Sequence, residues 1–180
     1  MGLLLTIALV WGVLEATIFF IIPDVIVTYI GLKGYKAATY AAIASLFGAL
    51  LGGVIMYVLG IYQFEVIAGF VEKVPAINET MMEEVKGSLQ NEGLIAMILG
   101  PTKGIPYKIY AIYANQLGIG FISFILASIP ARFIRFYLTG LLAAFFSVTV
   151  LPKLAKKAKV FIWLIVWIIV YVIYFSVHPF

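Results

Sequence analysis

Six ionisable side chains lie inside or beside apolar stretches that are long enough to enter a lipid bilayer. Four are basic and two are acidic, namely Lys103, Lys108, Arg132, Arg135, Glu15 and Asp24. On insertion scales a charged side chain near the membrane centre costs about 2.5 to 3.5 kcal/mol, so it normally faces a partner, water or a polar substrate. The pattern predicts a membrane protein with a polar interior, as in a transporter, rather than an inert anchor.

The composition supports a membrane setting and argues against several enzyme classes. Of the 180 residues, 64% are hydrophobic and only 11% are charged, whereas soluble domains are roughly a quarter charged. The chain has no Cys, and its one His lies at position 178, so cysteine-based zinc sites and thiol nucleophiles are excluded. No nucleophile and base pair is evident, and we expect no enzyme activity, no cofactor and no metal site.

The net charge of +4 is small, and its densest cluster is Lys153–Lys159. A short basic cluster next to an apolar segment is typical of contact with anionic lipids, so we expect no nucleic-acid partner. The apolar N-terminus lacks a basic leader and a small-residue cleavage site, which predicts that no signal peptide is removed.

The hydrophobic pattern divides the chain into six segments of one membrane domain. In order they are a first broken region (1–36), a spanning helix (37–61), an amphipathic region (62–92), a second broken region (93–116), a kinked spanning helix (117–151) and a final spanning helix (160–178). The spanning segments approach or exceed the roughly 20 apolar residues that cross a bilayer. Pro130 is expected to kink or tilt the fifth segment.

The two broken regions carry prolines where a continuous helix would need backbone donors. Pro23 precedes Asp24 in the first region, and the second holds Pro101, Gly104 and Pro106 in close succession. Proline removes a donor and clashes with the preceding turn. Non-helical backbone at membrane depth is tolerated only against protein or a wet cavity. Both regions are therefore predicted to form re-entrant hairpins.

Charged connections set the expected orientation. Lys33–Lys36 and Lys153–Lys159 lie in two connections, and both are expected on the cytoplasmic side. The chain between them must then cross an even number of times. Two crossings, at 37–61 and 117–151, satisfy this count if the second broken region returns to its own side. The same count places Phe180 outside.

A faint internal repeat agrees with opposed hairpins. Pro23 followed by Tyr57–Gly60 is echoed by Pro106 followed by Tyr137–Gly140, at an offset of about 80 residues. Opposed halves of this kind form an inverted repeat with binding near the midplane. We therefore predict an all-α integral membrane protein with two opposed re-entrant hairpins and about three spanning helices. Four crossings, with 117–130 as a separate short span, remain an alternative.

Two helical patterns concern packing. Ala41, Ser45, Gly48 and Gly52 form a stripe of small residues on the first spanning helix, which predicts close contact with another helix. In the amphipathic region Pro75 separates two helices, Met81, Val85 and Leu89 share one face, and Thr80–Glu83 has capping-box spacing. This region is expected along the outer membrane surface or over the second broken region, with a solvated connector as the alternative.

The basic residues fall into two pairs that fit a phosphate group. Lys103 and Lys108 flank a non-helical stretch whose exposed amides attract anions, although snorkelling to the interface is an alternative. Arg132 and Arg135 project from one helical face, where two guanidinium groups can grip a phosphate or carboxylates. Their alternative is a fixed salt bridge to Glu15, Asp24 or outer glutamates.

Glu15 and Asp24 are expected to face one cavity because the chain turns at Pro23 between them. Paired buried carboxylates can take up and release a proton during a transport cycle. A buried ion pair is the alternative role for Glu15, and a helix cap is the alternative for Asp24.

The order of these motifs resembles the DedA family of VTT-domain, SNARE-associated membrane proteins. The residues that carry the resemblance are Glu15, Pro23, Asp24, Gly48, Gly52, Tyr57, Gly60, Gly100, Lys103, Pro106 and Lys108. The stretches IPYKIY at 105–110 and SIPARFIRFY at 128–137 are similar to the YqaA-like branch. The resemblance covers nearly the whole chain.

The resemblance implies opposed re-entrant hairpins and a role in moving lipids across the bilayer, such as recycling of a polyprenyl-phosphate carrier or phospholipid scrambling. It implies that Glu15 and Asp24 are the family's membrane-embedded acids and that Lys103 is the first basic residue of the second hairpin. Many members carry a second Arg where this chain has Ile109, with Lys108 one position earlier, and Arg135 is the candidate to compensate.

The functional hypothesis is transport of a phosphate-bearing lipid, a polyprenyl phosphate or a phospholipid, between leaflets of the cell membrane. The four basic residues would bind the headgroup, and the two acids would couple movement to protons. Membrane lipids and protons are thus the expected partners, and a homo-oligomer is left open. A proton-driven small-solute or cation antiporter and a non-transporting scaffold remain alternatives.

Overall fold

The computed structural model describes residues 1–177, apart from the side chain of Thr102. The described residues form helices and no strands, which confirms the predicted all-α class. Three helices are long and apolar enough to cross a membrane, namely α3 (Tyr35–Tyr62), α8 (Phe121–Phe145, extended by a π-helical turn to Val150) and α9 (Lys156–Val177). The shorter helices are α1 (Gly2–Thr17), α2 (Asp24–Gly31), α4 (Phe64–Val71), α5 (Glu79–Glu92), α6 (Leu94–Leu99) and α7 (Tyr107–Gln116), with a 3-10 turn η1 (Gly100–Lys103).

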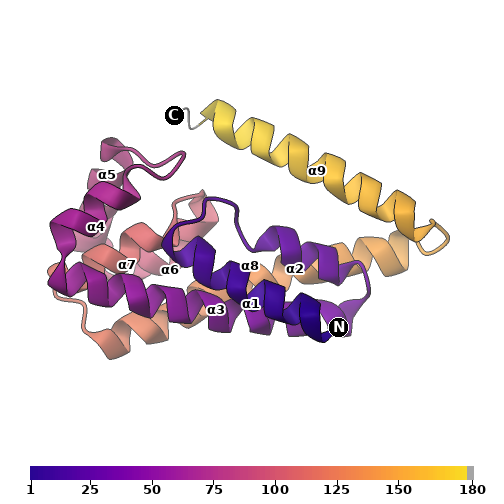
Figure 1. Ribbon diagram of the computed structural model, residues 1–180, viewed down its shortest axis with the longest axis horizontal. Coiled ribbons are helices and arrows are strands. Elements are labelled where there is room, and N and C mark those ends of the chain that lie inside the picture. The colour runs from indigo at the N-terminus through magenta and orange to yellow at the C-terminus, as the bar shows by residue number, and fades with distance from the viewer. Residues whose placement is uncertain (178–180) are drawn as a thin grey trace.

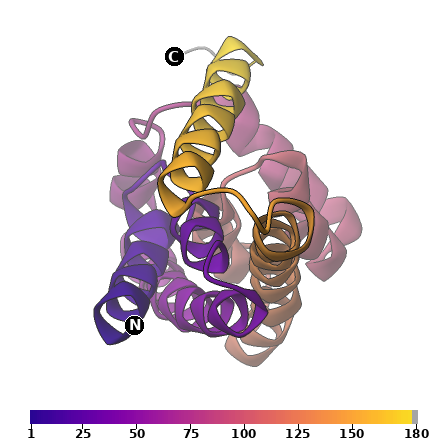
Figure 2. The ribbon, with the colours of Figure 1, turned by 90° about the vertical axis from the view of Figure 1, so that its right-hand side faces the viewer.

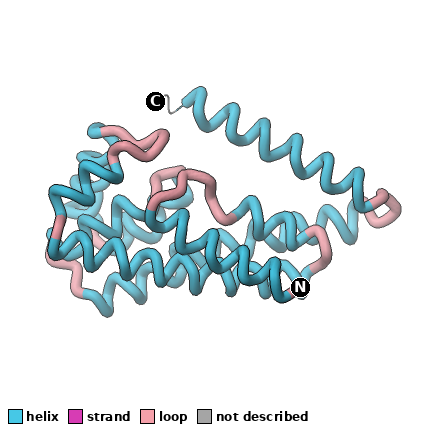
Figure 3. Tube along the Cα trace, in the orientation of Figure 1, coloured by secondary structure: helices cyan, strands magenta, loops and turns pink. Residues whose placement is uncertain are grey.

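Helices α3 and α8 pack together along the bundle (Figure 1), and all of the shorter helices except α5 pack against one or both of them. From the N-terminus α1 runs toward the middle of the molecule, where the chain turns and α2 runs back toward the starting end (Figure 1). Loops follow α1 and η1 near the middle of the bundle (Figure 3). Residues of both loops line one cavity, so the two breaks lie close together in space.

Two prolines mark the restart of the chain after each break. Pro23 is the N-cap of α2 and Pro106 is the N-cap of α7. Proline is tolerated at the start of a helix because its missing N–H would have no partner there. Gly104 adopts a left-handed conformation with φ of 87° and turns the chain out of η1. The helix breaks expected from the sequence are therefore present at these positions.

Pro130 behaves differently and corrects one expectation. It lies inside α8, which runs without interruption from Phe121 to Phe145. The segment 117–130 is therefore not a separate short helix, and the four-crossing alternative is wrong in that respect. An isolated proline within a long apolar helix is tolerated because neighbouring groups satisfy the freed carbonyl.

The predicted stripe of small residues forms the contact between α3 and α1. A Cβ added at Gly48 would collide with the Leu9 carbonyl oxygen. Ser45 Oγ donates a hydrogen bond of 3.3 Å to the carbonyl of Ala8. Backbone approaches this close require small side chains, so the packing prediction is confirmed.

Helices α1 and α7 pack one after the other along α3. A Cβ at Gly52 would lie 2.8 Å from the Cβ of Ala16, near the end of α1. The neighbouring Gly53 abuts the hydroxyl of Tyr107 at the start of α7, and α7 continues along α3 as far as Gly60. The two half-length helices therefore meet beside Gly52 and Gly53, near the middle of α3.

Helices α4 and α5 pack against α7, and α5 also packs against α6, so they cover the second broken region, one of the two predicted positions. Met81, Val85 and Leu89 are buried as expected. The predicted capping box at Thr80–Glu83 is wrong, because Asn78 is the N-cap of α5 and accepts a 2.9 Å hydrogen bond from the amide of Met81. Asparagine is among the strongest N-cap residues, and here it begins the helix two positions earlier.

The two lysine-rich connections lie at the same end of the molecule. Ser147 Oγ donates a 2.7 Å hydrogen bond to the carbonyl of Leu32, and the hydroxyls of Tyr35 and Thr149 are 3.0 Å apart. Figure 2 faces this end, from which α9 rises away from the other helices. The expectation that both connections share one side is consistent with this arrangement.

We expect Gly48→Leu to lower the stability of the protein by about 1 to 3 kcal/mol, because the new side chain would be forced against the backbone of α1. The melting temperature of the purified protein in detergent measures the change. Gly87→Ala is the matched control, because a Cβ at Gly87 on α5 meets no atom within 4 Å. Equal melting temperatures for both variants would contradict the close contact.

Candidate functional site

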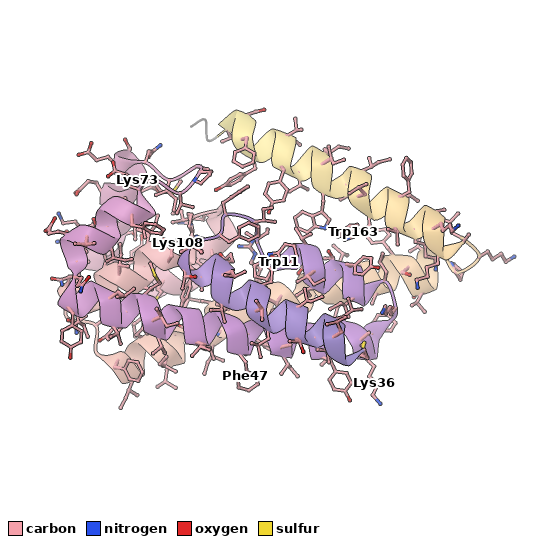
Figure 4. The ribbon with its side chains drawn as sticks, viewed as in Figure 1. Trp11, Lys36, Phe47, Lys73, Lys108 and Trp163 are labelled. Atoms are coloured by element: carbon pink, nitrogen blue, oxygen red, sulfur yellow. The ribbon has the colours of Figure 1, made fainter. Side chains whose placement is uncertain are left out.

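A cavity of about 200 Å³ lies where the two broken regions meet. Its walls come from α1, the loop after it, the segment after α4, the loop before α7, α7 itself, α8 and α9. Four charged side chains line it, namely Glu15, Lys108, Arg132 and Arg135. We call it the central cavity. Residues that are far apart in the sequence thus converge on one chamber. Lys108 lies near the C-terminal end of α1 (Figure 4).

Arg132 and Glu15 form a buried ion pair. Arg132 Nη2 donates to Glu15 Oε2, and the two side chains are only 1% and 5% exposed. The guanidinium also lies over the rings of Tyr107 and Phe136, at 5.1 and 4.8 Å from their centroids, a favourable cation–π geometry. In the described part of the chain Arg132 Nε is buried without a hydrogen-bond partner. The Nε–H donor of Arg132 is therefore available to a ligand.

Arg135 and Asp24 form a second ion pair, with Nη2 3.2 Å from Oδ2. That oxygen has no hydrogen-bond partner among the described residues, so the contact is electrostatic. Thr139 Oγ1 donates to the other Asp24 oxygen at 3.0 Å, and Arg135 Nη1 donates to the carbonyl of Pro101 at 2.9 Å. Arg135 therefore links the first turn of α2 to the break that precedes α7.

Lys108 is the cation without an acidic partner. Its Nζ donates a 2.7 Å hydrogen bond to the carbonyl of Phe19, its side chain is buried, and no carboxylate of the described residues lies within ion-pair distance. Buried charges are normally paired. The site therefore holds three cations and two carboxylates, with one positive charge in excess.

The predicted site residues fall into three groups. Glu15, Lys108, Arg132 and Arg135 line the central cavity. Asp24 does not line it but joins the same charge cluster through Arg135. Lys103 is exposed at the end of η1 and does not line the cavity, so the structure does not bring it together with the other basic residues.

The aromatic wall on α9 was not anticipated from the sequence. Tyr171 and Tyr174 line the central cavity, and the Tyr171 hydroxyl accepts a 3.0 Å hydrogen bond from the amide of Ile22. Trp163 and Trp167 point toward the bundle from the same helix. The spacing of 163, 167, 171 and 174 places all four on one helical face, and that spacing was the available signal.

We expect Glu15→Gln to cost about 3 to 5 kcal/mol of unfolding free energy, because it leaves the Arg132 charge buried without a counterion. Adding Arg132→Met should restore much of that loss, since both charges are then gone. Chemical denaturation in detergent measures the cycle. Glu83→Gln is the control: it removes an exposed partner of Lys86 at 3.5 Å, and should change stability by less than about 1 kcal/mol. A double variant as unstable as Glu15→Gln would contradict the pairing.

Comparison with known proteins adds one relative. The chain is 24% identical over 153 residues to a Haemophilus influenzae protein described as uncharacterized, an alignment that covers 85% of this chain and 79% of that protein. No protein-family model and no solved structure matches the chain. The similarity extends over most of both chains.

Proposed function

We propose that this protein is a membrane transporter that moves a phosphate-bearing lipid between the leaflets of the bilayer. One observation carries the proposal: three cationic side chains and one carboxylate line a cavity among apolar helices, and the second carboxylate, Asp24, reaches this cluster only through Arg135. A phosphate group supplies the missing negative charge and accepts hydrogen bonds from Lys and Arg. Lys108, which has no acidic partner, and Arg132 Nε, which has no hydrogen-bond partner among the described residues, are the groups that would bind it first.

The wall of the central cavity suits a ligand with a long apolar tail. Val170, Tyr171 and Tyr174 close it on one side, and α9 has no buried residue. A helix that is held by one face can separate from the bundle without opening the rest of the core. In this mechanism the headgroup enters beneath α9 while the tail remains in the surrounding lipid.

The two acids would allow the site to release the lipid headgroup. Phosphate and carboxylate compete for the same guanidinium donors. When Glu15 takes up a proton, Arg132 loses its counterion and is free to hold phosphate, and when the proton leaves, the carboxylate displaces the headgroup. Asp24 acts on Arg135 in the same way. Proton uptake would thus be coupled to lipid binding.

In the membrane we assign α1 with α2, and α6 with α7, to two re-entrant hairpins that enter from opposite sides, as the resemblance to the DedA family implies. The charge distribution supports this orientation. One end of the molecule carries Lys33, Lys36, Lys153, Lys156, Lys157 and Lys159, and neither of its connections contains an acid. The glutamates of α4 and α5 lie at the other end (Figure 1). The lysine-rich end is therefore proposed to be cytoplasmic.

The alternatives fit the charge cluster less well. A cation antiporter would bring a positive substrate to a site that already has an excess of positive charge. A scaffold with locked salt bridges accounts for Glu15 with Arg132 and for Asp24 with Arg135 but leaves Lys108 unexplained. The excess charge therefore favours an anionic ligand.

We expect Lys108→Gln to slow leaflet exchange of a fluorescent phosphatidic acid in reconstituted vesicles by about tenfold or more, since a charged hydrogen bond contributes about 1.5 to 3 kcal/mol. Lys157→Gln removes an exposed lysine that does not line the cavity, and it should leave the rate unchanged. Both proteins must elute as single species in size-exclusion chromatography. An unchanged exchange rate for a folded Lys108→Gln protein would reject the headgroup role.

The orientation can be checked with single cysteines, because the natural sequence contains none. Glu84→Cys should react with a membrane-impermeant maleimide in intact cells. Lys33→Cys and Lys153→Cys should react only after the cells are permeabilised. Labelling of either lysine-end variant in intact cells would overturn the assigned orientation.

A further inference from the structure

A second cavity lies between α2, α8 and α9, apart from the central cavity. Its volume is about 460 Å³, and apolar side chains make up most of its lining. Trp163 and Trp167 form its α9 wall and both donate to Thr28 Oγ1, at 2.9 and 3.0 Å. Trp163 points from α9 toward the bundle in Figure 4. We call this cavity the α9 groove.

The α9 groove opens toward a group of lysines. Lys159 lines both the groove and an adjoining cavity of about 380 Å³ that is also lined by Lys33 and Lys156. Lys159 Nζ donates to the carbonyl of Ser147 at 2.5 Å. No acidic residue of the described chain lines either cavity, so the positive charge at this mouth is uncompensated.

The inner end of the groove approaches the charge cluster. Val170 lines both the α9 groove and the central cavity. Thr139 lines the groove and also donates to Asp24. The α9 groove therefore extends from the lysine mouth, along apolar walls, to a position next to the arginine and carboxylate cluster.

We propose that the α9 groove is a second binding site, which holds an anionic membrane lipid with its phosphate on Lys33, Lys156 and Lys159 and a hydrocarbon chain beside Trp163 and Trp167. Charge at one end and apolar walls along the rest match an amphiphile rather than a free anion. Lysines at the end of an apolar segment attract anionic lipid headgroups. As a loading site for the central cavity it rests on the proposed function, whereas binding in the groove does not require transport.

The two tryptophans of the groove provide the readout. The full-length protein in neutral detergent is titrated with phosphatidic acid that carries bromine atoms on its acyl chain, which quenches nearby tryptophan fluorescence. The chain has three tryptophans, so a Trp11→Phe background leaves only the two in the groove. We expect saturable quenching, with much weaker quenching by a phosphatidylcholine brominated in the same way. Equal quenching by both lipids would overturn the phosphate assignment.

Two triple variants separate the mouth from general surface charge. Replacing Lys33, Lys156 and Lys159 with Gln should raise the midpoint of quenching by about tenfold or more. Replacing them with Arg should preserve binding, because the positive charges are kept. This result would show that the Gln variant binds weakly because it lacks the charges. The matched control replaces Lys36, Lys153 and Lys157 with Gln, at the same end but outside both cavities. Equal weakening by both Gln variants would reject a defined site.

Two further measurements distinguish this site from its competitors and from the central cavity. Inorganic phosphate should not displace the brominated lipid, and displacement at equal concentration would identify a free-anion site instead. Arg132→Gln should retain quenching and lose leaflet exchange. If Arg132→Gln exchanges lipid normally, the proposed function fails while the groove stands. If the Gln variant of the mouth binds weakly but exchanges normally, the loading role is overturned.

Discussion

The structure depends on holding five charged side chains inside an apolar fold. They are those of Glu15, Asp24, Lys108, Arg132 and Arg135. Arg132 binds Glu15 and Arg135 binds Asp24, so one face of α8 is tied to α1 and to α2, on both sides of the first break. Breaking a buried pair leaves a charge that neither lipid nor apolar side chains can solvate. The pairs therefore hold α1 and α2 against α8, and the loop between the two helices can remain non-helical because protein surrounds it.

The helix breaks could be predicted because proline acts through the backbone alone. Pro23 and Pro106 restart helices, as their missing donors require. Pro130 shows the limit of the same rule, since it lies within α8. The sequence around Pro130 is apolar on both sides, and only the neighbouring helices decide whether a proline ends a helix or is absorbed by it. The cap of α5 was misplaced for a similar reason, because several polar residues near Asn78 compete for that role.

The charged part of the site was more predictable than its walls. Charged side chains in apolar segments normally pair with one another or face water. Glu15, Arg132 and Arg135 could therefore be expected to meet. The sequence could not rank Lys103 against Lys108, since their difference in burial depends on which side of the break each one occupies. Tyr171 and Tyr174 belong to a helix without any charge after its first turn, and their role becomes visible only when α9 is placed over the bundle.

The meeting of α1 and α7 beside Gly52 and Gly53 has an electrical consequence. With about 1.5 Å of rise per residue, α1 extends roughly 24 Å and α7 roughly 15 Å, so neither helix runs the full length of α3 and both end inside the bundle. A cluster at that depth lies part-way down the voltage drop of an energised membrane, which amounts to about 2.3 kcal/mol per elementary charge for each 100 mV. Under the proposed function, the occupancy of Lys108 and Arg132 by an anionic headgroup would vary with the polarisation of the cell.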